Sequence, residues 1–329
     1  MKRHLMLSLS IIYLSINVLG CASTNEMHGL FKKSDYDKML ERQKQRQVAL
    51  DVSNDIEEIL KNIPDIDASG YESRGDYHMA KGDMAKAYVQ YRKAMEMNPD
   101  HPGLRYKIGR LYLKKGLSEQ AIKEFMNIFS YDENNALAFD GLGRSYFKLN
   151  KMQKAEENFL HALELDPELW QAHNFLGIIY NRQRMFDRAV QEFTSALSLH
   201  PNDGMILNNL GLSYYFTGEY EKAVDLYIQA LKTEGSSVRI YNNLALALCR
   251  LGRYNEALHA FREAGSKASA YNNIGYYHLK EGHYDKALQA FENAIENNST
   301  FYVKAYENMK NVKASSHRDL PRAVEPLHE

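Results

Sequence analysis

The stretch Lys154–Pro167, "KAEENFLHALELDP", spaces Ala155, Phe159 and Ala162 four and three residues apart. This spacing puts a small, a large and a small side chain on one face of a helix, and Pro167 ends that helix. The same alanine recurs every 34 residues, and an aromatic residue follows it by four. The alanines are Ala87, Ala121, Ala155, Ala189, Ala223 and Ala257, and the aromatic residues are Tyr91, Phe125, Phe159, Phe193, Tyr227 and Phe261. This recurrence predicts an array of equivalent helical units.

A small residue also stands twelve positions before each of these alanines. The residues are Gly75, Gly109, Gly143, Gly177 and Gly211, with Ala245 in the sixth copy. A glycine inside a helix costs about 1 kcal/mol relative to alanine, so its recurrence needs a physical reason. We interpret the glycine as the point where two helices cross with no room for a side chain.

Together these positions resemble the tetratricopeptide repeat, a helix–turn–helix unit of 34 residues. A seventh copy carries Gly275, Ala287 and Phe291, and Ala287 follows Ala257 by only 30 residues, so the sixth repeat is four residues shorter. Gly265 can cap its shortened second helix. The resemblance implies an all-α, right-handed superhelical solenoid of about seven repeats with a C-terminal capping helix. We expect repeats at 68–101, 102–135, 136–169, 170–203, 204–237, 238–267 and 268–301, a capping helix at 302–313 and a flexible tail at 314–329.

The N-terminus has the pattern of an export signal. Lys2 and Arg3 are basic, and the apolar run Leu5–Leu19 is shorter than the roughly 20 residues of a membrane span. The stretch "VLGC" at Val18–Cys21 resembles the lipobox of bacterial lipoproteins, which implies cleavage before Cys21 and a lipid on that residue. The alternative is a chance cysteine beside an ordinary signal peptide.

The same resemblance implies a location for the protein. Alanine rather than aspartate follows Cys21, which implies a lipid anchor in the outer membrane, facing the periplasm. We therefore expect a signal peptide at 1–20 and a lipid-anchored tether with a leading helix at 21–67. The leading helix either covers the open end of the array or binds a partner.

Residue patterns that indicate catalysis are missing from the sequence. It has no metal-ligand spacing, nucleophile elbow or phosphate loop, so we expect no cofactor, no metal, no small-molecule substrate and no enzymatic activity. A formal net charge of −1 argues against a nucleic-acid partner. His173 and His278 fall at packing positions, where we expect hydrogen-bonded core residues. Cys249 lies within an apolar helix pattern, which predicts a buried structural thiol.

The first helices of tetratricopeptide repeats line a concave groove that commonly binds partners, so the resemblance points to that face. Side-chain amides both donate and accept hydrogen bonds, and a row of them can pair with an extended peptide, as in the asparagine ladder of some family members. Nearby basic residues favour an acidic segment or a C-terminal carboxylate. The fifth repeat positions hold Asn174, Asn208, Asn242 and Asn272, the sixth hold Asn209, Asn243 and Asn273, and the thirteenth hold Lys114, Lys148, Arg182, Arg250 and Lys280.

Two readings of these groove residues remain open. Asparagine at the sixth position is common in such repeats, and a charged thirteenth residue is otherwise simply solvated. If the groove reading holds, replacing Asn208, Asn242 and Asn272 with alanine should abolish partner capture without an appreciable change in melting temperature.

A further resemblance concerns the biological role. The shortened repeat, followed by "FYVKAYEN" at 301–308, is similar to the C-terminal half of TadD-type lipoproteins, which serve Flp (tight-adherence, type IVb) pilus assembly at the outer membrane. This implies a membrane-anchored interaction scaffold whose protein partner is a secretin or another pilus or secretion component. The alternatives are a pilotin of type IVa pili, a regulator of a cell-wall synthase and a periplasmic chaperone.

Overall fold

The computed structural model describes residues 66–298 and 302–315 of the chain. Every regular element in these ranges is an α-helix, which confirms the predicted all-α solenoid of helix pairs with a final helix behind them. None of the described helices is long and apolar enough to cross a membrane. The predicted signal peptide, Cys21, nearly all of the tether and leading helix, and the tail from residue 316 lie outside the described residues.

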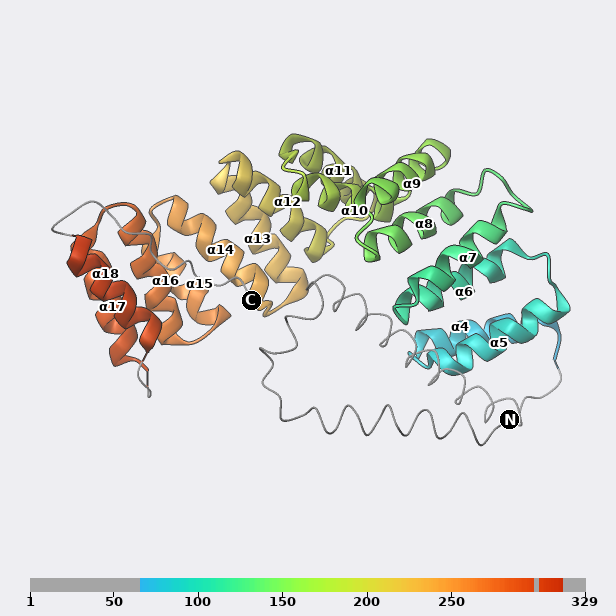
Figure 1. The fold of residues 1–329 in the computed structure, drawn as a ribbon, viewed down its shortest axis with the longest axis horizontal. Coiled ribbons are helices and arrows are strands. Elements are labelled where there is room, and N and C mark those ends of the chain that lie inside the picture. The colour runs from blue at the N-terminus through green and yellow to red at the C-terminus, as the bar shows by residue number, and fades with distance from the viewer. Residues whose placement is uncertain (1–65, 299–301, 316–329) are drawn as a thin grey trace, which may run out of the picture. The chain divides into compact units, whose positions relative to one another are not determined.

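The chain divides into two compact units, Met1–Tyr131 and Asp132–Glu329. The described part of the first unit consists of two helical hairpins (Figure 1). Its core includes the buried side chains of Tyr71, Tyr91 and Ile108. The helices are α4 (Ala68–Ala80), α5 (Met84–Met97), α6 (Pro102–Lys114) and α7 (Ser118–Ile128).

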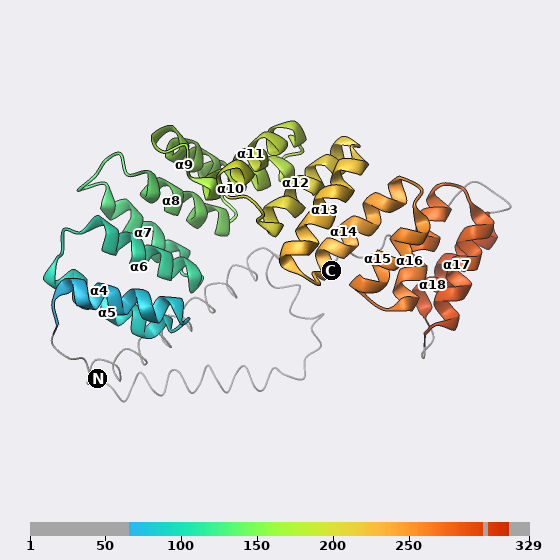
Figure 2. The ribbon, with the colours of Figure 1, turned by 180° about the vertical axis from the view of Figure 1, so that it is seen from behind.

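The second unit stacks five hairpins and a final helix in chain order (Figures 1 and 2). Successive hairpins share apolar contacts: Leu197 and Tyr214 pack against both of the large core clusters of this unit. The helices are α8 (Ala136–Lys148), α9 (Met152–Leu165), α10 (Trp170–Arg182), α11 (Phe186–Leu199), α12 (Gly204–Thr217), α13 (Tyr220–Glu234), α14 (Val238–Arg250), α15 (Tyr254–Ala264), α16 (Lys267–Lys280), α17 (Tyr284–Glu296) and α18 (Val303–Ser315).

Local sequence sets where the helices of each hairpin begin and end. Several first helices have a side-chain N-cap; for example, Asn135 Oδ1 accepts a hydrogen bond of 2.8 Å from the amide of Ala138. Between the two helices of each hairpin, one residue adopts the left-handed conformation, which stops the first helix and reverses the chain. These residues are Gly82, Gly116, Asn150, Arg184, Gly218, Gly252 and Gly282.

The repeated glycine lies directly under an aromatic ring of the second helix, as predicted. A Cβ atom at Gly143 would stand 2.7 Å from the ring of Phe159, and one at Gly177 would stand 2.6 Å from the ring of Phe193. These separations are shorter than any ordinary carbon–carbon contact, so the position excludes a side chain wherever the ring lies this close. The rings themselves are fully buried.

Two further sequence predictions concern buried polar groups. Cys249 is a fully buried free thiol, which confirms the structural reading, and burial raises its pKa far above the usual range. His278 is buried as expected, with 7% of its surface exposed. The prediction that its hydrogen bonds are satisfied is wrong, because Nδ1 is buried and has no partner among the described residues.

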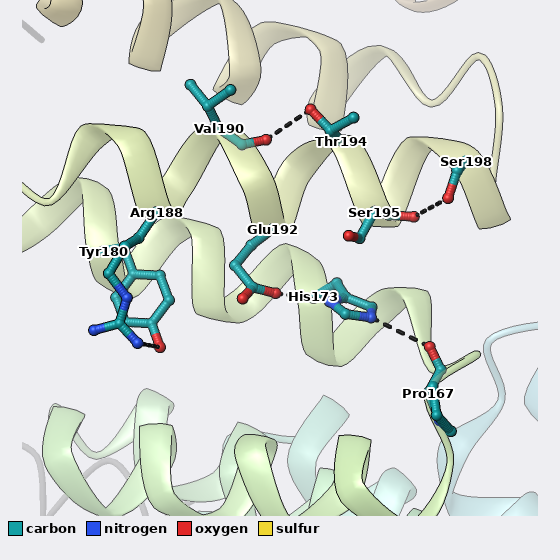
Figure 3. Close-up of polar contacts among 9 residues, drawn as sticks. All are labelled: Pro167, His173, Tyr180, Arg188, Val190, Glu192, Thr194, Ser195 and Ser198. Atoms are coloured by element: carbon teal, nitrogen blue, oxygen red, sulfur yellow. Dashed lines mark hydrogen bonds and ion pairs between the residues drawn. The ribbon is translucent and has the colours of Figure 1, made fainter.

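His173, by contrast, is fully engaged between α10 and α11 (Figure 3). Its Nδ1 lies 2.7 Å from Glu192 Oε2, and its Nε2 lies 3.2 Å from the carbonyl oxygen of Pro167. Both neighbours accept hydrogen bonds, so the protonated imidazolium, which donates from both nitrogens, fits this position best. The hydrogen bond to Glu192 raises the pKa of His173 against the opposing effect of burial.

The raised pKa of His173 makes part of the stability dependent on pH. A group with a raised folded-state pKa stabilises the fold fully below its unfolded pKa of about 6.5, and this contribution disappears as pH rises through the folded pKa. His173→Gln should therefore lower the free energy of unfolding by about 1 kcal/mol more at about pH 5.5 than at about pH 9.

Urea denaturation at the two pH values measures this difference. Glu192→Gln should show the same pH-dependent loss of stability as His173→Gln. Thr194→Ala, a substitution at an exposed position of the same helix, should show no such pH dependence. A pH-independent loss in His173→Gln would contradict the assignment.

Candidate functional site

Six of the predicted asparagines line one cavity of about 540 Å³ in the second unit. We call this cavity the asparagine groove; the first helices α12, α14 and α16 form most of it, and α18 closes one end. The asparagines are Asn208, Asn209, Asn242, Asn243, Asn272 and Asn273. The structure therefore brings together half of the residues that the repeat positions indicated.

The asparagine groove lies where the array is shortened. Helix α15 has 11 residues, whereas the second helices of the three preceding repeats have 14 or 15. Ala264 and Gly265, at the end of this short helix, line the groove together with Phe261. Helix α15 therefore ends about one turn earlier than those helices, and its last residues border the groove.

Three of the asparagines in the groove take part in hydrogen bonds between neighbouring helices. Asn243 Nδ2 donates a hydrogen bond of 2.9 Å to Asn208 Oδ1, and Asn308 Nδ2 of α18 donates one of 3.2 Å to Asn272 Oδ1. Asn208 and Asn272 are each 2% exposed. Asn208 and Asn272 therefore face the next helix in the stack and bond to an amide there. For these two residues the structure predicts a loss of stability on replacement, where the sequence led us to expect an unchanged melting temperature.

Other asparagine side chains remain accessible to a ligand in the groove. Asn209, Asn242, Asn243 and Asn273 are partly exposed and line the cavity. Asn174 does not line it; its Oδ1 is buried on α10 and accepts no hydrogen bond from the described residues. The sixth position, together with Asn242, is thus the surface that a ligand in the groove would meet.

The predicted basic residues lie outside the groove. Lys148, Arg182, Arg250 and Lys280 are exposed in the second unit, and Lys114 is exposed in the first. The Arg182 guanidinium stacks 4.9 Å from the ring centroid of Phe147, and that of Arg250 stacks 5.0 Å from that of Tyr220. These cation–π contacts give the thirteenth position a role in packing between repeats.

Two other cations line the groove, and the repeat pattern did not single them out. Among the described residues, Arg239 and Lys304 are the only charged ones that line the groove, and none of those lining it is a carboxylate. Each is the second residue of its helix, α14 and α18, so inspection of that register could have found them. The hydroxyls of Tyr277 and Tyr302 add hydrogen-bonding groups, and burial raises the pKa of both, which keeps them protonated. The lining therefore favours an anionic ligand that also has polar backbone groups.

Comparisons with known proteins agree with this architecture. A family model described as the C-terminal domain of cilia and flagella-associated protein 70, a tetratricopeptide-repeat domain, matches residues 32–273. The model of the tetratricopeptide repeat itself matches residues 268–301. The chain belongs to this tetratricopeptide-repeat family. Proteins built from such repeats are generally non-enzymatic scaffolds that bind other proteins.

Individual relatives share the repeat over part of their length or share the fold. The BBSome complex member BBS4 of Bos taurus is 35% identical over 65 residues, which span 20% of this chain and only 12% of that protein. The C-terminal part of a tetratricopeptide-repeat protein from Cytophaga hutchinsonii has a TM-score of 0.54 at 18% identity, covering 72% of this chain and 98% of that one. A chain of the Cut9–Hcn1 hetero-tetramer of the APC/C has a TM-score of 0.53 at 18% identity, and the match covers 74% of this chain and 48% of that one. At these identities the structures show a common fold.

The amide pairs predict different roles for two asparagines at the same repeat position. Asn208→Ala removes the buried Oδ1 that accepts the hydrogen bond from Asn243 Nδ2. The substitution should lower the free energy of unfolding by about 1–2 kcal/mol, because Asn243 loses its partner. Asn242→Ala, at a partly exposed position, should change it by less than about 0.5 kcal/mol. Chemical denaturation of the two variants beside the wild type measures both values, and equal losses would contradict the assigned pairing.

Proposed function

We propose that the protein is a membrane-anchored scaffold that helps to assemble a pilus or secretion machine by binding an extended segment of a partner protein in the asparagine groove. The observation that carries this proposal is the cavity of about 540 Å³, whose lining within the described part of the chain combines partly exposed amides and two cations and contains no carboxylate. Such a lining matches a peptide better than an apolar ligand.

The amides give the groove a way to hold a peptide of varied sequence. Asn209, Asn243 and Asn273 occupy the same position in successive first helices and are all partly exposed. An extended backbone offers carbonyl and amide groups at regular spacing, and each side-chain amide can both donate to and accept from it. The groove would therefore provide affinity through the backbone of the partner.

The charge of the lining favours a particular kind of segment. Arg239 and Lys304 come from α14 and α18, on two of the helices that border the groove. Carboxylates on the bound segment would meet these cations without a competing acidic residue in the lining. We therefore infer an acidic segment, or one that ends in a free carboxylate.

The location and the machine rest on the sequence resemblances. The lipobox-like "VLGC" supports an anchor at Cys21 in the outer membrane, facing the periplasm, and "FYVKAYEN" after a shortened repeat supports a role like that of TadD-type lipoproteins. A secretin or another pilus or secretion component is the partner that this role requires. A lipid on Cys21 would hold the mature protein at the same membrane as such a complex.

Charge reversal within the groove tests the binding site. Arg239→Glu combined with Lys304→Glu should weaken binding of acidic peptides, taken from the secretin and pilus subunits of the host, by about tenfold or more, because like charges would then face each other. Fluorescence anisotropy of labelled peptides measures the affinity. The control is Arg182→Glu with Lys280→Glu, which reverses two exposed cations outside the groove; equal weakening in both double variants would refute the site.

A second experiment tests the anchor. Cys21→Ala in the full chain, produced in a bacterial host, should move the protein from the membrane fraction to the soluble periplasmic fraction while its helical circular dichroism is preserved. Ser23→Ala is the matched control and should stay in the membrane fraction. Retention of Cys21→Ala in the membrane would rule out lipidation at this residue.

A further inference from the structure

The sequence continues after α18, the helix that closes one end of the asparagine groove, with the tail 316–329, "SHRDLPRAVEPLHE". The two halves of this tail differ in charge. Arg318 and Arg322 both fall in its first half, whereas the second half, 323–329, has two glutamates and neither lysine nor arginine. We call residues 323–329 the acidic tail segment. Its charge is of the kind that the lining of the groove favours.

The tail is long enough to reach the groove of its own chain. Lys304, near the start of α18, lines the groove, and the helix ends at Ser315. At a rise of about 1.5 Å per residue, the helix separates these two residues by about 17 Å. The stretch 316–322 spans about 23 Å when it is extended, at about 3.3 Å per residue. It can therefore run back along α18 and bring the acidic tail segment to Lys304.

Both cations of the groove are available to carboxylates. Arg239 is exposed, and its Nη2 lies 2.7 Å from Met205 Sδ, which is a weak acceptor. Lys304 is partly exposed and has no acidic partner among the residues that the structure describes. A carboxylate is a much better partner for either cation. The acidic tail segment supplies two, those of Glu325 and Glu329.

The groove also offers apolar surface that suits the rest of the segment. Leu212, Leu246 and Tyr277 line the groove and are partly exposed. Val324 and Leu327 are the large apolar residues of the acidic tail segment. Contact between these two sets of side chains would remove apolar surface from water, which favours binding independently of charge.

Pro326 favours the extended backbone that the groove amides can pair with. A proline ring fixes its own φ at about −65°, and the residue before a proline is biased towards extended conformations. Glu325 is that residue. An extended backbone presents its carbonyl and amide groups to side-chain amides such as those of Asn209 and Asn243, which line the groove.

We propose that the acidic tail segment binds in the asparagine groove of its own chain and competes there with the partner segment. A short flexible connection gives the tail an effective concentration in the millimolar range. A segment that binds with a Kd of about 0.1 mM would then weaken the binding of a competing peptide by about tenfold. The competition rests on the function proposed above, whereas occupation of the groove by the tail does not.

A fluorescein-labelled peptide of residues 323–329 tests the proposal on the full chain. Fluorescence anisotropy should show binding to the variant Glu325→Gln with Glu329→Gln about tenfold tighter than to the wild type, because the neutral tail no longer competes. The matched control, Glu292→Gln with Glu296→Gln, neutralises two exposed carboxylates of α17 and should bind the peptide as weakly as the wild type. Equal affinity for wild type and tail variant, or a Kd above about 1 mM for both, would overturn the proposal.

Photocrosslinking locates the tail without an added peptide. With p-benzoylphenylalanine in place of Leu327, irradiation of the full chain should crosslink the tail to residues that line the groove of the same chain, which mass spectrometry identifies. Arg239→Glu with Lys304→Glu should reduce the yield by about fivefold, whereas Arg182→Glu with Lys280→Glu, outside the groove, should leave it unchanged. Crosslinks outside the groove, or a crosslinked dimer in place of the internal product, would overturn the proposal.

The partner peptides separate failure of this inference from failure of the proposed function. Peptides from the secretin and pilus subunits that bind the wild type and the tail variant equally well would reject competition by the tail and leave the proposed function standing. A crosslink from the tail into the groove, with no binding of those peptides to the tail variant, would support occupation by the tail and reject the proposed function.

Discussion

The contact between an aromatic ring and bare backbone governs each described hairpin with a repeat glycine. The ring of Phe159 lies over Gly143, and that of Phe193 lies over Gly177, so close that a Cβ atom would overlap it. The glycine costs about 1 kcal/mol of helix propensity, but burying the ring contributes about 1.5–3 kcal/mol. The ring can approach the first helix this closely only where no side chain stands between them, so the contact holds the two helices at one crossing point. Because the glycine and the ring recur, the same hairpin geometry recurs along the chain.

Repetition of this contact allows other positions to vary without loss of the fold. In a repeat array each unit contacts mainly its neighbours, so a local change is not transmitted far. The sixth repeat replaces the glycine with Ala245, which is fully buried against a still-buried Phe261, and it shortens its second helix to 11 residues. The asparagine groove lies beside that shortened helix.

The asparagine groove lies where the repeat departs from its own pattern. Ala264 and Gly265, at the end of the short α15, are among its lining residues. Charged residues that follow the pattern have packing partners instead: Arg182 stacks on Phe147, and Arg188 on Tyr180.

The sequence alone determined the helical fold, the recurrence of the hairpins, the close crossing at each glycine and the burial of Cys249, because all of these follow from spacing within one helix or between two neighbouring helices. It also indicated the row of asparagines. Only the tertiary structure decided which way each amide points. The bonds from Asn243 to Asn208 and from Asn308 to Asn272 depend on how one repeat is rotated against the next. That rotation results from packing along the whole interface and leaves no periodic signal, so the inward asparagines and the unpartnered nitrogen of His278 appear only in three dimensions.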